Sequence, residues 1–396
     1  MKTGLLILIA GLLCVLLNDS LLYWQIKRYL KKRIYNCLFW LHSLFFMACI
    51  VVYHFFIPTL KGPEAYFWVG KGVSVILLFY TPKTLYIIIN IFAILLRKLK
   101  CIPASRIIHR TALGLAAFSF LLIFYGITWG RYNFKVEHQQ VCIKELPDNF
   151  NGFRIVQLTD LHLGSYGEHY PGVKKLVNEV NALNPDLIVF TGDMVNSFAS
   201  EMDPWIEQLK KLKAKHGVYS STGNHDYGTY VRWATPEEQK NNLKQFFINM
   251  ETAGFQMLNN TNVPLVIGTD TIYLAGVENC GRPPFPCFGN LPQALQGTEG
   301  HPVILLSHDP SHWRDEVIRF PVALMLAGHT HAMQIGIQIG NFRWSPSIYV
   351  YPEYNGLYET NGRQLYVSRG SGYLGFAGRI GQRPEITLIE LTNDCK

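Results

Sequence analysis

Charged side chains are scarce in this sequence of 396 residues. Asp, Glu, Lys and Arg make up 16% of it, whereas hydrophobic residues make up 49%. Soluble domains carry about 25% charged residues on average, so this shortage argues against a wholly soluble protein. The length is also too great for one ordinary domain. The composition therefore indicates a membrane segment joined to a globular part.

Acidic residues are almost absent from the first third of the chain. Residues 1–135 hold 16 Lys and Arg but only 2 Asp and Glu, whereas the remainder holds 20 basic and 26 acidic residues. The net charge of +8 therefore belongs to the first third. The mildly acidic remainder disfavours nucleic acid, which binds to basic surfaces, so we expect no nucleic-acid partner.

Four apolar stretches precede residue 130, at about residues 4–24, 37–57, 67–96 and 111–129. Each except the third matches the ~20 residues that cross the hydrocarbon core of a bilayer. The third contains Pro82 and reads as one kinked span or as two. A signal peptide is an alternative for the first stretch, but no small-residue cleavage pattern follows it. We therefore expect a membrane domain of about four transmembrane helices over residues 1–130.

Two basic clusters set the expected orientation. Residues 27–33 follow the first stretch and residues 97–110 follow the third, and basic loops face the cytoplasm. Both clusters share a side only if the third stretch is a single span. We then expect an integral protein of the cytoplasmic membrane, with its globular domain on the outer, periplasmic or extracellular, face. Residues 131–149 are expected to form a linker and a first strand, and residues 150–396 the globular domain.

Five apolar runs in the globular part each end in a turn that delivers Asp, His or Asn. The residues that follow these predicted strands are Asp160, His162, Asp193, Asn224, His308, His329 and His331. A single Asp or His at a strand end is usually a turn former or a satisfied polar group. The repetition matters, because sites in open α/β sheets lie beyond the carboxyl ends of the strands. We therefore expect the seven side chains to converge.

These side chains are nitrogen and oxygen ligands, with no cysteine among them. Imidazole suits Zn, Fe, Mn or Ni, and carboxylate and amide oxygens add harder donors. Seven ligands are too many for one four-coordinate zinc but suit two metals, ~4 Å apart, that share a carboxylate. We expect two divalent metal ions, with Mn, Fe or Zn favoured.

The ordered motifs resemble the calcineurin-like metallophosphoesterases, in particular membrane-anchored bacterial phosphodiesterase-type members. The motifs are Asp160-Leu161-His162, Gly192-Asp193, Gly223-Asn224-His225-Asp226, His308 and Gly328-His329-Thr330-His331, and the resemblance covers about residues 150–392. It implies an α/β fold in which two mixed sheets pack face to face with helices outside, a four-layer α/β/β/α sandwich.

The resemblance also implies a role for each motif residue. One metal would be held by Asp160, His162, Asp193 and His331, and the other by Asp193, Asn224, His308 and His329, with Asp193 as the bridge. His225 would contact the phosphate and protonate the leaving oxygen. The sequence departs from some relatives at Asn196, where they carry an Asp that orients this histidine. His225 is therefore expected to be less basic, or to be held by Asp226.

The predicted function is that of a membrane-anchored, metal-dependent phosphoesterase. Its substrate would be a phosphomonoester, phosphodiester or pyrophosphate, and the short linker suggests a lipid-linked one. The alternative is a membrane receptor or transport-associated protein that uses the metal domain for binding only.

Four further features are open or discounted on the sequence alone. Cys280 and Cys287 would close a disulfide loop in an oxidising compartment. Residues 370–375 match GxGxxG but lack the helix of a dinucleotide site, so we expect a loop beside the metals. Residues 227–254 are read as a helix packed on the core rather than as a lid. His312 lacks motif context and is expected at the surface or in a loop.

Overall fold

The computed structural model describes residues 2–60, 62–167, 170–340 and 342–395. The chain forms two compact units, Met1–Thr128 and Trp129–Lys396, which we call the membrane unit and the catalytic unit. Each unit is described by itself.

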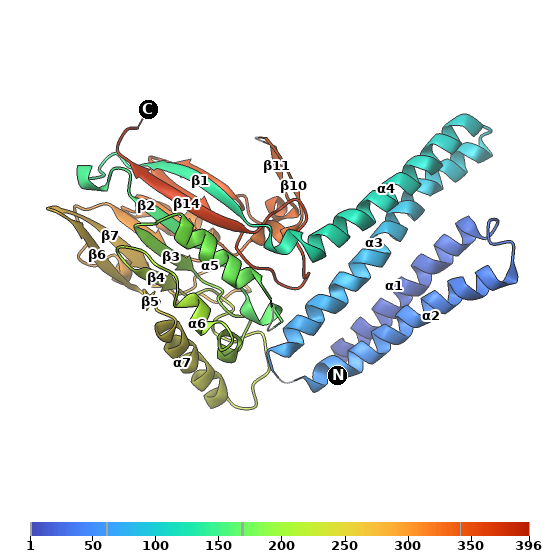
Figure 1. The fold of residues 1–396 in the computed structure, drawn as a ribbon, viewed down its shortest axis with the longest axis horizontal. Helices are drawn as coiled ribbons and strands as arrows, with labels where there is room; N and C mark the ends of the chain where they lie inside the picture. Colours follow the sequence, from blue (N-terminus) through green and yellow to red (C-terminus); the bar gives the residue numbers. More distant parts are fainter. Residues whose placement is uncertain (1, 61, 168–169, 341, 396) are drawn as a thin grey trace. The chain divides into compact units, whose positions relative to one another are not determined.

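The membrane unit consists of long apolar helices (Figure 1). They are α1 (Lys2–Ile26), α2 (Arg33–Phe56), α3 (Glu64–Lys98) and α4 (Ile102–Thr128). Within the described part of the chain, four helical segments are long and apolar enough to cross a membrane. The third apolar stretch is a single helix of 35 residues, which continues through Pro82. This continuity agrees with the interpretation of that stretch as one span.

Polar side chains inside the membrane unit bond to one another. The Lys83 ammonium on α3 lies 2.8 Å from a carboxylate oxygen of the fully buried Asp19 on α1. The Tyr80 hydroxyl donates to the other oxygen of Asp19 at 3.0 Å. Further along, the Asn90 amide donates to the Gln25 side chain at 2.8 Å. In hydrocarbon these groups have no water to bond, so each needs its partner within the bundle.

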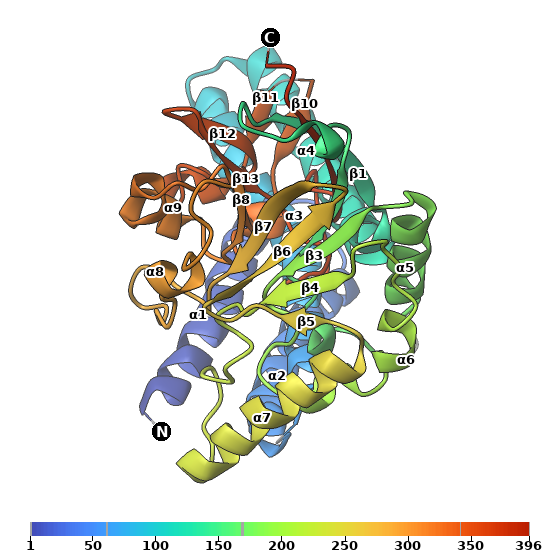
Figure 2. The same ribbon diagram turned by 90° about the vertical axis from the view of Figure 1, so that its left-hand side faces the viewer.

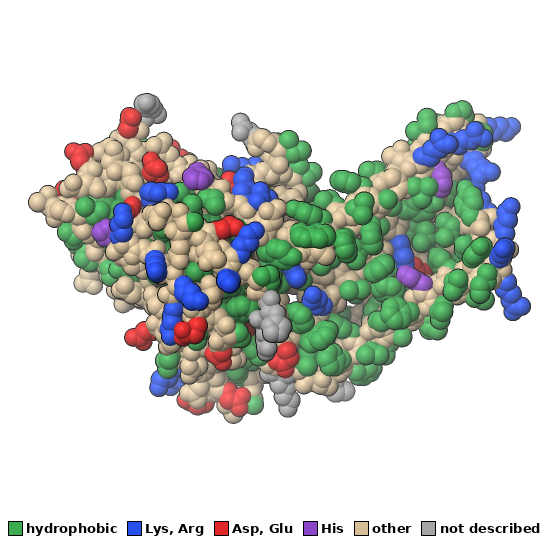
Figure 3. Space-filling view, viewed as in Figure 1, with side chains coloured by type: hydrophobic (Ala, Val, Ile, Leu, Met, Phe, Trp, Pro, Cys, Tyr) green, Lys and Arg blue, Asp and Glu red, His purple; other side chains and the backbone are tan. Residues whose placement is uncertain are grey.

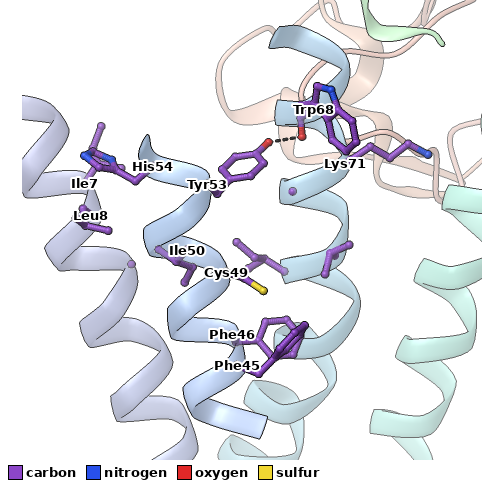
Figure 4. A pocket seen from close by; sticks show the side chains of 14 residues that line it. Ile7, Leu8, Phe45, Phe46, Cys49, Ile50, Tyr53, His54, Trp68 and Lys71 are labelled. Carbon is purple, nitrogen blue, oxygen red and sulfur yellow. Dashed lines mark hydrogen bonds between the residues drawn. The ribbon is translucent and has the colours of Figure 1, made fainter. Parts of the chain in front are cut away.

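Helices α1, α2 and α3 also line a pocket of about 490 Å³ (Figure 4). Ile7, Phe46 and Ile50 are among its mostly apolar lining. At one end the Tyr53 hydroxyl of α2 donates to the carbonyl of Trp68 on α3. A lining of this composition accommodates hydrocarbon better than a phosphate group.

Two six-stranded sheets form the centre of the catalytic unit. The first contains β1 (Lys135–Cys142), β14 (Glu385–Thr392), β2 (Arg154–Leu158), β3 (Leu187–Thr191), β4 (Val218–Ser221) and β5 (Gln256–Met257), in that order. The second contains β12 (Gly356–Thr360), β13 (Arg363–Val367), β9 (Leu324–Ala327), β8 (Val303–Leu306), β7 (Asp270–Gly276) and β6 (Thr261–Ile267). Both sheets are mixed: β2 to β5 are parallel, as are β7, β8, β9 and β13, whereas β14 runs antiparallel to β2 and β6 antiparallel to β7.

The two sheets pack face to face through one apolar core. Ile155 and Val189 of the first sheet lie in the same buried cluster as Leu306 and Leu326 of the second. Because side chains alternate along a strand, the residues between them point outwards and require helices to cover them.

Helices cover both outer faces (Figure 2). They are α5 (Gly172–Ala182), α6 (Ile206–Leu209) and α7 (Pro236–Thr252) on the first sheet, and α8 (Leu291–Ala294) and α9 (Ser311–Asp315) on the second. Phe246 and Met250 of α7 are fully buried in the cluster under the first sheet. The predicted four-layer sandwich is thus confirmed, and the helix of residues 227–254 packs on the core.

The structure contradicts one expectation made outside the motifs and bears out another. His312 is buried in α9, where its Nδ1 and Nε2 lie within hydrogen-bonding distance of Ser307 and Glu316, so its expected surface position is wrong. The Cys280–Cys287 disulfide is present. A second disulfide joins Cys142, the last residue of β1, to Cys395, which follows β14. This disulfide was not predicted.

Candidate metal centre

The predicted site residues follow five parallel strands and come together at the carboxyl ends of these strands. Asp160 follows β2, Asp193 follows β3, Asn224 follows β4, His308 follows β8 and His329 follows β9. Strands of both sheets thus contribute side chains to the site.

The backbone is strained at this convergence. Five of the predicted ligands have a positive φ between 49° and 68°, namely Asp160, His162, Asp193, His329 and His331. The left-handed region costs a non-glycine residue on the order of 1 kcal/mol or more. Such strain persists only where the surrounding structure enforces it, and here it turns each side chain back towards the others.

One cluster consists of Asp160, His162, His331 and Asp193. The Nε2 atom of His331 lies 3.2 Å from Asp160 Oδ1 and 3.0 Å from His162 Nε2. The Nε2 atom of His162 is also 3.6 Å from Asp193 Oδ2. A single proton between the two imidazoles cannot satisfy all these contacts, whereas a cation at their centre can.

A second cluster consists of Asp193, His308, His329 and Asn224. The Nε2 atom of His308 lies 3.1 Å from Asp193 Oδ2, the same oxygen that faces His162. The Nδ1 atom of His329 lies 2.9 Å from Asn224 Oδ1 and 3.2 Å from His308 Nε2. His329 and His331 therefore point into different clusters, and Asp193 belongs to both.

The donor set of the second cluster fits a metal ion. His308 Nδ1 lies 2.7 Å from the Thr191 carbonyl and must donate to it, so in the neutral ring Nε2 presents a lone pair to the Asp193 carboxylate. Two lone pairs that face each other need a cation between them. Burial alone would lower the pKa of His308, but the Asp193 and Asp160 carboxylates raise it to about 10, because a proton takes the place of that cation.

The pKa values of Asp160 and His162 also reflect opposing effects of burial and of neighbouring charges. Burial alone would raise the pKa of the Asp160 carboxyl, yet His331 and His308 hold it below its usual range. Burial lowers the pKa of His162 well below its usual value, against the attraction of Asp193. A histidine kept neutral in this way is in the form that binds a metal.

Two glycines make room for the carboxylates. A Cβ on Gly223 would lie 2.2 Å from Asp193 Oδ1, and a Cβ on Gly328 would lie 2.3 Å from Asp160 Oδ2. Neither position accepts a side chain without displacing a ligand.

His225 lies at the mouth of the site and is held by the backbone. Its Nδ1 is 2.8 Å from the Asn196 carbonyl oxygen, and its ring stacks on Tyr230 at 4.2 Å. Burial lowers the pKa of His225 below its usual value, and the opposing attraction of the Asp193 carboxylate offsets only part of this effect. Because Nδ1 donates to the carbonyl, Nε2 is the ring nitrogen available to a substrate.

The contact with the Asn196 carbonyl shows that Asp226 is not the partner of the His225 ring. Asp226 does not hold the ring; its carboxylate accepts the backbone N–H groups of Asp193, Met194 and Gly223. Asp226 therefore fixes the turn that carries Asp193. Asn196 does face His225, but through its carbonyl oxygen rather than its side chain.

Two tyrosines at the site were not predicted. The Tyr351 hydroxyl lies 2.8 Å from His329 Nε2 and accepts the proton of that nitrogen when Nδ1 faces the cluster. The Tyr230 hydroxyl accepts from the Asn224 amide at 2.7 Å, which directs the amide oxygen towards His329. Both contacts orient a predicted ligand. Neither tyrosine lies in a strand-end motif, so no local signal in the sequence marks it.

The GxGxxG segment is a loop beside this site, as expected. The backbone N–H of Gly372 donates to the Asp160 carbonyl at 2.9 Å. Next to the clusters lies a pocket of about 340 Å³, whose lining includes His225, Phe285, Met333 and Val350. The site is therefore open to a ligand, with apolar side chains at its rim.

The fold and the site together define a class: a two-sheet α/β sandwich with a His, Asp and Asn cluster suited to metal-dependent hydrolysis. Residues 153–333 match the family described as calcineurin-like phosphoesterase. Residues 4–131 match a family described as the transmembrane domain of probable calcineurin-like phosphoesterases. The chain belongs to the calcineurin-like phosphoesterases and is a membrane protein of that family. It is a hydrolase of phosphoric esters, and its family uses divalent metals.

Curated relatives support this assignment. A transmembrane protein with a metallophosphoesterase domain from Danio rerio is 32% identical over 341 residues, which cover 81% of this chain and 71% of the relative. A metallophosphoesterase of Bacillus subtilis is 31% identical over 255 residues, with 62% and 81% covered. The UDP-2,3-diacylglucosamine pyrophosphatase of Chlamydia trachomatis is 27% identical over 305 residues, with 62% and 86% covered.

Proposed function

We propose that the catalytic unit is a dinuclear metal phosphoesterase. The observation that carries the proposal is the shared Asp193 oxygen, which lies 3.6 Å from His162 Nε2 and 3.1 Å from His308 Nε2. In this proposal Asp160, His162, Asp193 and His331 hold one ion, and Asp193, Asn224, His308 and His329 hold the other. Nitrogen and oxygen donors in this mixture suit Mn, Fe or Zn.

When bound, two divalent ions would polarise the phosphoryl group and lower the pKa of the attacking water. The residues of the chain supply the rest. His225, fixed by its bond to the Asn196 carbonyl, presents Nε2 to the pocket, and in its imidazolium form, with both ring nitrogens protonated, it would give the Nε2 proton to the leaving oxygen. The hydroxyl of Tyr351 and the carbonyl of Thr191 keep His329 and His308 in the tautomers that face the clusters.

The substrate in this proposal is a lipid-linked phosphomonoester, phosphodiester or pyrophosphate. The membrane unit on the same chain supports this, as does the likeness to a pyrophosphatase whose name specifies a diacylated sugar nucleotide. Apolar side chains at the pocket rim, Phe285, Met333 and Val350, suit a ligand with hydrocarbon near its phosphate.

The test uses the full chain purified in detergent, with bis(p-nitrophenyl) phosphate as a generic diester. Hydrolysis is expected with Mn²⁺, Fe²⁺ or Zn²⁺ and is lost on chelation. Asp193→Ala removes the oxygen common to both clusters and is expected to lower the rate by about 1000-fold or more. Wild-type protein that remains inactive with all three metals, or that is matched by Asp193→Ala, contradicts the proposal.

We further propose that the catalytic unit faces the outside of the cytoplasmic membrane. All four cysteines of the catalytic unit are in disulfides, whereas Cys14, Cys37, Cys49 and Cys101 of the membrane unit are free. Disulfides form in oxidising compartments, and the basic loops at residues 27–33 and 97–110 favour the cytoplasm.

Cys101 gives a direct test of this orientation, because it is exposed in the basic connection between α3 and α4. In a chain whose other three free cysteines are replaced by Ser, an impermeant maleimide is expected to label Cys101 only after the cells are permeabilised. Labelling in intact cells contradicts the orientation.

A further inference from the structure

Exposed hydrophobic side chains in the catalytic unit are concentrated in one segment. Of the thirteen large ones exposed among its described residues, eight lie between residues 333 and 350. They are Met333, Ile335, Ile337, Ile339, Phe342, Ile348, Tyr349 and Val350, which we call the apolar ridge. Single exposed hydrophobic residues are ordinary, but a gathered patch marks an interaction surface.

Much of the apolar ridge lies on a small hairpin of β10 (Ile337–Ile339) and β11 (Phe342–Trp344). These strands pair with each other and, among the described strands, with no others. The hairpin projects from the catalytic unit and carries hydrophobic side chains (Figures 1 and 3). Ile339 is 73% exposed and Phe342 is 60% exposed. A two-stranded hairpin is marginally stable in water, so this one needs a surface to bury its apolar side chains.

The apolar ridge is continuous with the mouth of the metal centre. Met333 and Val350, at its two ends in the sequence, both line the pocket that contains His331 and Tyr351. A molecule lying on the ridge therefore has a direct apolar path to the clusters.

The chain enters the catalytic unit beside the base of this hairpin. Gln382 donates to the carbonyl of Trp344 on β11, and the next residue, Arg383, donates to the carbonyl of Asn133 at 2.9 Å. Asn133 belongs to the six residues, 129–134, that join α4 to β1. Six residues span at most roughly 20 Å, so the bilayer that holds α4 lies within reach of the hairpin.

We propose that the apolar ridge binds the lipid bilayer in which α1–α4 lie, and that a lipid of this bilayer reaches the metal centre along it. The substrate class is then a phosphate ester or pyrophosphate of a membrane lipid, with its acyl chains on the ridge. The exposed Arg343 on the same hairpin suits the phosphate groups of a lipid surface. The substrate part of this inference rests on the proposed function, whereas the binding of the apolar ridge to the bilayer does not.

Docking is tested without any activity measurement. A nitroxide is attached at Ile339→Cys in full chain whose four free cysteines are replaced by Ser, reconstituted in vesicles of phosphatidylcholine and phosphatidylglycerol. The label is expected to be relaxed by oxygen, which enters lipid, and protected from a water-soluble nickel chelate. Val266→Cys on the edge strand β6 is the control, because Val266 is 54% exposed but not on the apolar ridge. Equal access of the chelate to both labels overturns the docking.

The route to the site is tested with substrates matched in their phosphate group. Vesicles carry phosphatidic acid or CDP-diacylglycerol, and the soluble counterparts are glycerol 3-phosphate and CDP-glycerol. Ile339→Asp combined with Phe342→Asp is expected to lower kcat/KM for the lipid about tenfold or more, because the variant loses two apolar side chains that the bilayer would bury in the wild-type protein. The rate on the soluble counterpart is expected to stay within twofold.

The control Val266→Asp is expected to change neither rate. Hairpin variants that keep the lipid rate, or that lose both rates equally, overturn the route along the apolar ridge. A wild-type protein that hydrolyses none of these esters contradicts the proposed function instead, and the spin label then still decides the docking.

Discussion

Both units of the chain bury polar side chains, but the two units differ in how the charges and hydrogen bonds of these side chains are balanced. In the membrane unit the buried Asp19 carboxylate meets two donors, the Lys83 ammonium at 2.8 Å and the Tyr80 hydroxyl at 3.0 Å. In the catalytic unit the Asp193 oxygen instead faces two imidazole nitrogens that are neutral in their metal-binding form.

The two clusters differ in whether the protein itself balances their charges and hydrogen bonds. Groups whose charges and donors cancel are complete within the protein, and they tie helices together in a medium without water. Groups that present lone pairs to one another are incomplete, and a cation supplies what the chain lacks. The first cluster is expected to respond to mutation in stability, and the second in metal content and rate.

The largest effects are expected from His331→Ala and His329→Ala. Each removes one ligand, but from a different cluster, so each is expected to lose a different ion and to lower the rate by about 1000-fold. Metal analysis should give about one ion per chain for each variant and none for Asp193→Ala. Variants that lose both ions together would show that the clusters form a single site.

His225→Asn should separate proton donation from metal binding. The metal content is expected to be unchanged, because the clusters proposed to hold metal do not use this side chain. The rate should fall at least ~100-fold for an alkyl phosphate ester, whose leaving oxygen needs a proton. The loss should be much smaller for a p-nitrophenyl ester, whose leaving group needs none. An equal loss on both esters would contradict the role of His225 as a proton donor.

The strand-end pattern predicted that these side chains lie close together, because it is a local signal. An apolar run followed by Gly, Asp or His specifies a buried strand and the turn after it, and parallel strands bring those turns to one edge. The four-layer fold followed from the resemblance that these same motifs carry.

Contacts between distant segments could not be predicted in this way. Tyr351 reaches His329 only after the chain has made the projecting hairpin. Cys142 and Cys395 are 253 residues apart and meet because β1 pairs with β14. The partner of His225 is a backbone carbonyl, and no residue type specifies such a contact.

Asp19→Asn should destabilise the membrane unit without affecting the metal centre. It leaves the partly buried Lys83 ammonium without a counter-charge between the helices, which costs about 3 kcal/mol. Asp19→Asn combined with Lys83→Gln removes both charges and should recover most of the loss. Denaturant unfolding in detergent micelles measures both variants, with metal content as the unchanged reference. Equal stability of the single and double variants would mean that the pair does not hold α1 to α3.

The smallest effect is expected from Tyr351→Phe. This variant tests whether a side chain outside the proposed metal ligands contributes to metal binding by orienting one of them. The change keeps the ring but removes the oxygen that accepts the Nε2 proton of His329, so that the imidazole is less firmly held with Nδ1 towards Asn224. Loss of such an outer contact typically lowers metal affinity about tenfold. Chelator competition measures the affinity, and Tyr349→Phe is the matched control because its side chain is 79% exposed. If both variants bind metal alike, His329 is oriented by its strained backbone alone, and the hydroxyl of Tyr351 contributes only to the pocket wall.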